Sequence, residues 1–154
     1  MPPMSQIADA FVIAERIAAG NPPDSDAVAW LVSGLRRWAR GEPLEAALGL
    51  NHAGRMRRRN IELRAAAEVL RAGRDVSDWD LAGELAARLR RFSSGKLPRY
   101  YRTGDVSTFD AVERHLLAAA LTGAPTTNSK KNLYRIIERD PGQETVSLVH
   151  ANSR

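Results

Sequence analysis

The chain has 154 residues, of which 44% are hydrophobic and 27% charged, a balance that fits one soluble globular domain and excludes wholesale disorder. It has no cysteine, which excludes a disulfide framework and a thiolate metal site and fits a reducing cytoplasm. The net charge of +5 comes mainly from arginine, and since GC-rich genomes also favour arginine, this total does not by itself indicate a partner.

Apolar residues recur at helical spacing along nearly the whole chain, and the alternation typical of strands is almost absent. The sequence therefore predicts an all-α fold, a compact bundle of six to seven helices. The expected helices span residues 5–19, 24–40, 43–48, 53–72, 77–93, 108–122 and 129–138.

The first three helices have recognisable boundaries. Residues 20–23 (Gly-Asn-Pro-Pro) end the first helix, and Asp24 or Ser25 can cap the second. Pro43 suits the first turn of the third helix. The apolar sides of the first two helices are Ile7, Ala10, Phe11, Ala14, Ile17 and Ala18, and Val28, Leu31, Val32, Leu35 and Trp38.

In the second half, Ser77 begins a helix, because Ser77 and Asp80 stand three residues apart and negative charge favours a helix start. Residues 94–106 are predicted to be a loop. The apolar residues near 146–149 can add a lone strand or stay mobile. The expected core residues are Met56, Leu63, Ala66, Ala67 and Leu70; Trp79, Ala82, Leu85, Ala86, Leu89 and Phe92; and Phe109, Val112, Leu116, Ala120, Leu133, Ile136 and Ile137.

Charge is segregated along the chain. Residues 36–102, here called the basic belt, contain 16 Lys/Arg and 8 Asp/Glu, whereas residues 1–35 contain one basic and four acidic residues. Genomic bias does not choose one segment over another, so the belt suggests a polyanionic partner, with nucleic acid first. We expect one helical domain over residues 1–140, with a helical hairpin at 108–138, and a tail over 141–154 that can be flexible.

The densest cluster is an arginine-rich helix, in which Arg57, Arg64 and Arg71 share one face and neighbouring arginines widen it. Such a face suits phosphates along a duplex, since guanidinium groups bind phosphate oxygens bidentately. The alternatives are a solvated helix face, with Glu62 and Glu68 nearby, and an acidic protein partner. The cluster consists of Arg55, Arg57, Arg58, Arg59, Arg64, Arg71 and Arg74.

A second cluster combines cations with rings and has no acidic residue between Arg88 and Arg102. Single-stranded nucleic acid needs this combination, because bases stack on rings while phosphates meet the charges. In the alternative interpretation, Phe92 belongs to the core and the two tyrosines fix the loop to the body. The members are Arg88, Arg90, Arg91, Phe92, Lys96, Arg99, Tyr100, Tyr101 and Arg102.

The hairpin at 108–138 is similar to a helix-turn-helix, in which the second helix presents polar and basic side chains to the major groove. Its apolar anchors come about four residues late for a tight turn at Gly123. A longer turn over Gly123–Asn128 would accommodate them, and an ordinary helical hairpin is the alternative. The residues that would read bases are Lys130, Lys131, Asn132 and Arg135.

Several short sequence segments resemble those of small helical proteins encoded in proteobacterial phages and prophages. They include residues 40–44 (Arg-Gly-Glu-Pro-Leu), residues 47–50 (Ala-Leu-Gly-Leu), residues 90–92 with 98–100, and a closing Thr122-Gly123 with Leu133-Tyr134. The resemblance covers roughly residues 36–138. It implies a mobile-element context and supplies no catalytic residue.

No catalytic, cofactor or metal signature is recognised. His52, His115 and His150 are far apart in the chain, and the acidic residues near 75–80 are explained by a helix start. We therefore expect a protein that is not an enzyme and needs no cofactor.

A membrane protein is not expected either. Residues 1–6 lack the features of a signal peptide, and the longest apolar run, Leu116–Leu121, is far shorter than the ~20 residues that cross a bilayer. We therefore expect a cytoplasmic location.

The sequence thus predicts a phage-type DNA-binding protein, regulatory or related to packaging, with the acidic, apolar N-terminal helix serving dimerisation or a higher oligomer. The alternative is a phage-encoded interaction protein that binds and modulates a host protein through an acidic surface. The predicted nucleic-acid-binding residues are Arg55, Arg57, Arg58, Arg59, Arg64, Arg90, Arg91, Arg99, Lys130, Lys131, Asn132 and Arg135.

Overall fold

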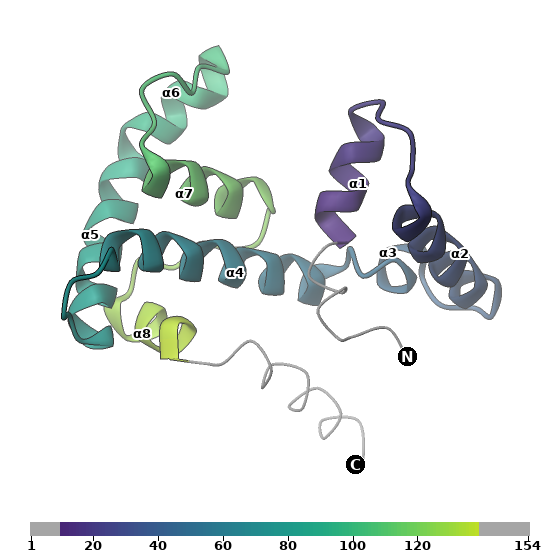
Figure 1. The fold of residues 1–154 in the computed structure, drawn as a ribbon, viewed down its shortest axis with the longest axis horizontal. Helices are drawn as coiled ribbons and strands as arrows, with labels where there is room; N and C mark the ends of the chain where they lie inside the picture. The colour runs from purple at the N-terminus through teal and green to yellow at the C-terminus, as the bar shows by residue number, and fades with distance from the viewer. Residues whose placement is uncertain (1–9, 139–154) are drawn as a thin grey trace. The chain divides into compact units, whose positions relative to one another are not determined.

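The structure, a computed structural model, describes residues 10–138, and these form eight helices and no strand (Figure 1). The prediction of an all-α fold is confirmed. The helices are α1 (Ala10–Ala18), α2 (Ser25–Ala39), α3 (Leu44–Ala47), α4 (His52–Arg71), α5 (Asp78–Ser94), α6 (Lys96–Thr103), α7 (Ala111–Leu121) and α8 (Lys130–Glu138).

The prediction of a loop over residues 94–106 is wrong, because α6 lies within it. Pro98 falls in the first turn of α6, where a missing backbone N–H costs little. Leu97 and Tyr100, three residues apart, pack against the core and fix the helix there. The proposed strand near 146–149, the start of the helix predicted over 5–19 and the tail over 141–154 lie outside the described residues.

The chain separates into two compact units, residues 1–58 and residues 59–154, and α4 begins in the first unit and continues into the second. The single domain expected over residues 1–140 stays a prediction.

In the first unit, α2 packs closely against α3. A side chain at Gly34 would collide with Leu48, since an added Cβ would lie 2.3 Å from its Cδ2 atom. On the same side of α2, the indole Nε1 of Trp30 donates to the Leu48 carbonyl at 3.0 Å. At the start of α2, the Asp24 side chain accepts a hydrogen bond from the Ala27 N–H, which confirms the predicted cap.

Most of the apolar stripe predicted for α2 is nevertheless exposed. Val28, Val32, Leu35 and Trp38 are between 40% and 54% exposed. The reason is that α2 places Gly34 against Ala47 and Leu48, at the end of the four-residue helix α3, which is too short to cover the rest of α2.

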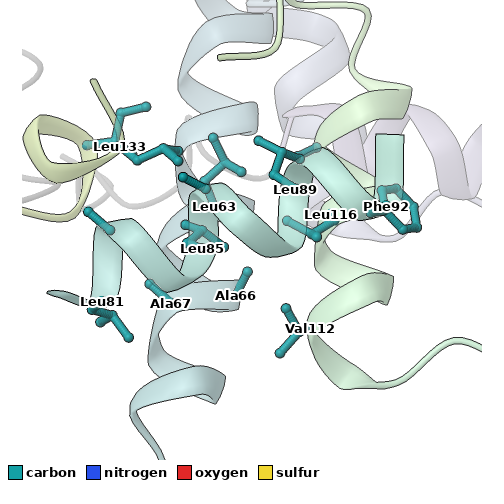
Figure 2. Close-up of a cluster of buried hydrophobic side chains, with 14 of the residues drawn as sticks. Leu63, Ala66, Ala67, Leu81, Leu85, Leu89, Phe92, Val112, Leu116 and Leu133 are labelled. Carbon is teal, nitrogen blue, oxygen red and sulfur yellow. The ribbon is translucent and has the colours of Figure 1, made fainter. Parts of the chain in front are cut away.

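The core of the second unit is built around α5, whose leucines form its centre. Leu81, Leu85 and Leu89 are at most 2% exposed, and each stabilises the fold by roughly 1.5–3 kcal/mol relative to an exposed side chain. Figure 2 shows Leu133 of α8 at one end of this cluster and Phe92 with Val112 and Leu116 at the other. The predicted core residues of α5 are confirmed except Trp79, which is 47% exposed.

Side chains that satisfy backbone N–H groups define where α5 and α7 begin. The Ser77 hydroxyl accepts from the Asp80 N–H at 3.1 Å, as predicted. Asp110 and Glu113 form a reciprocal capping box, with N···O distances of 2.8 and 3.1 Å. This box begins α7 at Ala111, slightly later than the predicted start at 108.

Replacement of Leu85 by Ala should lower the free energy of unfolding by about 2–5 kcal/mol, because the cavity is surrounded by buried side chains on several helices. Urea unfolding followed by circular dichroism measures this. Leu121→Ala is the control, since Leu121 is 50% exposed and its loss should change stability by only about 0.5 kcal/mol. Equal losses in the two variants would contradict the described core.

Candidate nucleic-acid interface

The structure gives Arg59, a predicted phosphate ligand, a role in the fold. Arg59 is 5% exposed, its Nη1 donates to the Pro125 carbonyl, and its Nε and Nη2 donate to the Asn60 side chain. A guanidinium in this position joins α4 to the connection between α7 and α8. It cannot reach a phosphate without giving up these hydrogen bonds.

Arg64 has a similar role one turn later on α4. Its Nε donates to the Ile136 carbonyl in the last turn of α8 at 2.7 Å. Positive charge is favourable at this end of a helix, where backbone carbonyls lack helical partners. Arg59 and Arg64 therefore hold α8 and the loop that precedes it. We exclude both residues from the candidate interface.

Arg71 and Arg74, which complete the arginine-rich helix, are paired with carboxylates. Arg71 Nη2 lies 2.6 Å from Asp78, and Arg74 Nη2 lies 2.8 Å from Glu84. The hydrogen bond from Arg74 holds the pKa of Glu84 below its usual value. The face predicted from Arg57, Arg64 and Arg71 is thus largely committed to contacts within the protein.

The arginines of α4 that belong to the first unit are only half-buried. The Arg55 guanidinium lies 5.9 Å from the centre of the Phe11 ring, which is a cation–π distance. Arg57 and Arg58 are partly accessible to solvent. These three residues stay candidates for phosphate contact.

Four exposed arginines of the described residues lie on the two consecutive helices α5 and α6. Arg90 and Arg91 are exposed in the last turn and a half of α5, and Arg99 and Arg102 are exposed on α6, which follows after Gly95 and packs against α5. Arg99 and Arg102 are three residues apart, so their side chains are neighbours on the helix surface. We call these four residues the α5–α6 arginine surface.

Within residues 10–138, none of these four arginines forms an ion pair. Other cations close in the sequence do: Arg88 lies 3.1 Å from Asp110, and Lys96 lies 2.6 Å from Glu113. An incoming phosphate would therefore break no described ion pair on the α5–α6 arginine surface, where Arg99 interacts electrostatically with the exposed Asp105.

The two tyrosines of α6 fit different interpretations of the second cluster: one has a structural role, and the other is accessible for stacking. Tyr100 is half-buried against the core, with its ring centre 6.4 Å from that of Phe109, and has the structural role. Tyr101 is 63% exposed, so its ring is accessible to a base. Arg102 belonged to the second cluster but was not among the predicted binding residues. It joins the surface because α6 places it three residues from Arg99 on an exposed helix.

The predicted helix-turn-helix is not confirmed. Its turn normally has three to four residues, whereas α7 and α8 are separated by residues 122–129. Moreover, α8 packs mainly on α5, away from the position that a recognition helix takes against its partner.

The four predicted base-reading residues of α8 have different surroundings. Lys130 Nζ lies 4.4 Å from the centre of the Trp79 ring, and the Asn132 amide donates to Thr127 at 3.3 Å. Lys131 and Arg135 are exposed. Of the four, only Lys131 and Arg135 are exposed without a described side-chain contact and could reach a base directly.

The basic residues of α8 and the α5–α6 arginine surface lie toward opposite ends of α5. Lys130 contacts Trp79 and lies beside Gly83, whereas Arg90 and Arg91 come at least seven residues later. At 1.5 Å per residue, this is a separation of about 10 Å along the helix axis. Among the described residues, Lys130 of α8 is therefore separate from Arg90 and Arg91.

Other chemistry has little support within the described part of the chain. It contains no group of three or more His, Asp or Glu side chains placed to hold a metal ion. The half-buried His115 Nδ1 lies 2.7 Å from the buried Glu62 carboxylate. Among residues 10–138, no helix has the length and apolarity needed to cross a membrane.

Comparisons of the sequence with protein-family models and with curated proteins, and of the structure with solved structures, found no match. The proposals below therefore depend on the chain's own residues.

Replacement of Arg59 by Ala should destabilise the second unit by about 1.5–3 kcal/mol, because a charged hydrogen bond to Pro125 is lost in a buried site. Thermal and urea unfolding measure the change. The exposed Arg91→Ala should stay within about 0.5 kcal/mol of the parent. An Arg59→Ala protein as stable as the parent would contradict this role in the fold.

Proposed function

We propose that the protein binds nucleic acid through the α5–α6 arginine surface, as a phage-type DNA-binding protein with a regulatory or packaging role. The observation that carries the proposal is the set of four exposed arginines on two consecutive helices, none of them ion-paired with another described residue.

The chemistry of these side chains favours phosphate as the ligand. A guanidinium group presents its N–H donors in a planar fork that matches two phosphate oxygens. On α6, the packing of Leu97 and Tyr100 against the core holds the backbone that carries Arg99 and Arg102. Binding therefore requires ordering of side chains only, which keeps its entropic cost low.

Tyr101 adds a contact that phosphate alone does not use. Its exposed ring lies next to Arg102 in the sequence and can stack on an unpaired base. A duplex would gain little from this ring, because its bases are already stacked. The proposal therefore includes binding to single strands or to duplex ends as well as to duplex phosphates.

Sequence-specific reading is not required by this proposal. Phosphate contacts give affinity and position, whereas base-edge contacts give specificity. Lys131 and Arg135 on α8 are the exposed residues that could add base contacts if a duplex reaches that end of α5.

Affinity for duplex DNA should fall steeply with salt. Four phosphate contacts give a slope of log K against log [salt] of about −3.6, which is a loss of about 10²-fold between 50 and 200 mM salt. Fluorescence anisotropy with a labelled duplex measures the slope. A flat response would contradict the proposal.

Arg102→Gln should make the salt slope shallower by about one, because one phosphate contact is removed. Arg114→Gln is the matched control, since Arg114 is also exposed in the second unit, on α7, and its loss changes the net charge equally. If both variants shift the slope by the same amount, the effect is one of net charge, and the assigned surface is wrong.

Tyr101→Ala should weaken binding to a single strand by about 1–3 kcal/mol and leave duplex affinity nearly unchanged, since only unpaired bases can stack on the ring. Tyr101→Phe, which keeps the ring, should bind like the parent. Paired titrations of single-stranded and duplex oligonucleotides test this, and equal losses on both ligands would argue against stacking.

An acidic host protein could use the same arginines, and competition separates the two functions. Under the proposal, duplex DNA binds directly and releases any acidic protein captured from the host. A captured protein that excess DNA cannot release, together with no direct DNA binding, would favour the alternative.

A further inference from the structure

The outward side of α5 carries a line of residues that the core does not use. They follow one another at intervals of four, four, three and four residues, which places them on one helix face, turned away from the buried leucines. None of them is buried. We call them the α5 stripe, and they are Trp79, Gly83, Ala87, Arg90 and Ser94.

Lys130 of α8 adds a cation at the Trp79 end of the α5 stripe. Its Nζ lies 4.4 Å from the centre of the Trp79 ring, and a Cβ atom added at Gly83 would lie 3.2 Å from the Lys130 Cε. The missing side chain at Gly83 therefore leaves the lysine its path across α5. Because the cation–π contact restricts the side chain, the ammonium group is held in place before a ligand arrives.

The charges along the α5 stripe favour an anionic ligand. Asp80 borders the stripe beside Trp79, where it accepts a hydrogen bond from the Ser77 hydroxyl at 2.7 Å. The next acidic residue of α5, Glu84, is held by Arg74. Beyond Glu84, α5 carries only neutral and basic residues. Lys130 itself forms no ion pair with another described residue.

We propose that a single strand of nucleic acid lies along the α5 stripe, between the α5–α6 arginine surface and Lys130 of α8. This path rests on the proposed nucleic-acid binding and deepens it, because it makes an unpaired strand the ligand and gives its direction across the fold. Figure 1 shows α6 and α8 toward opposite ends of α5. Phosphates of the strand contact Arg90 and Lys130, which lies over Gly83, so the two contacts are about 10 Å apart along the helix axis.

Exposed rings at the two ends of this path favour an unpaired strand over a duplex. Tyr101 is 63% exposed on α6, and Trp79 is 47% exposed although Lys130 lies over its ring. Bases stack on such rings only when they are not already stacked within a duplex. From Trp79 to Ser94 the stripe measures about 22 Å, which a stacked strand covers with about seven nucleotides at roughly 3.4 Å each.

Fluorescence anisotropy with labelled oligothymidylates of about 4 and about 12 nucleotides tests the path. One 12-mer should bind per protein. Lys130→Gln should weaken binding of the 12-mer roughly five- to ten-fold at about 50 mM salt and make the salt slope shallower by about 0.7, because one phosphate contact of a single strand is lost. The 4-mer, which is too short to reach from the arginines to α8, should be nearly unaffected.

Lys131→Gln is the matched control for this experiment. Lys131 is the next residue of α8, carries the same charge and is exposed, but helical geometry turns it about 100° away from Lys130. Its replacement should change the affinity for the 12-mer by less than about two-fold. Equal losses in the two variants would show an effect of net charge and overturn the proposed path.

Intrinsic fluorescence gives a second readout that needs no change at Lys130. The chain has three tryptophans, of which the other two lie in α2. The 12-mer should quench the fluorescence of the parent, and this quenching should be lost in Trp79→Phe. A duplex of the same length should quench little, because its bases are already stacked. Quenching that persists in Trp79→Phe would contradict the path.

Failure of the path and failure of the proposed function give different results. A 12-mer that binds and is weakened by Arg102→Gln, but neither responds to Lys130→Gln nor quenches Trp79, would overturn the α5 stripe and leave the arginine surface in place. No binding of the 12-mer or of a duplex would overturn the proposed function itself. Circular dichroism checks that each variant is folded, and if Lys130→Gln is not, the quenching in the parent decides.

Discussion

Burial of one face of α5 is the constraint that organises the second unit. Leu81, Leu85 and Leu89 are surrounded by apolar side chains from α4, α7 and α8 (Figure 2). Because this face is fully used, the outward face of the last turns of α5 must meet solvent, and it carries arginine there. The direct continuation into α6 then adds Arg99 and Arg102 nearby. The exposed positive surface is thus a consequence of how the core is filled.

Arginine has two distinct roles in this molecule. On α4, Arg59 and Arg64 donate to backbone carbonyls of residues far along the chain, and Arg71 and Arg74 pair with carboxylates. On α5 and α6, Arg90, Arg91, Arg99 and Arg102 form no ion pair with another described residue, whereas Arg88 pairs with Asp110. A count of basic residues does not separate these two roles. Only the exposed arginines of α5 and α6 can bind a polyanion without giving up contacts that stabilise the fold.

The helices, their caps and most of the core could be predicted from the sequence, because spacing and capping are local properties. Ser77 was recognised as a cap, and Leu63, Leu85 and Leu133 as core residues. The role of Arg59 could not be predicted, since its carbonyl partner at Pro125 is 66 residues away. α6 was missed because it contains Pro98 and several charged residues, and only two of its side chains, Leu97 and Tyr100, pack against the core. The exposed side of α2 was missed because an apolar stripe does not reveal whether the same chain covers it.

Arginine-specific modification with phenylglyoxal, read by mass spectrometry with and without bound oligonucleotide, tests the central claim most directly. Each arginine then serves as an internal comparison for the others. Our account predicts that Arg90, Arg91, Arg99 and Arg102 react in the free protein and are protected by nucleic acid, whereas the buried Arg59 reacts in neither state. Unchanged reactivity of these four residues, with protection confined to α4 or α8, would contradict it.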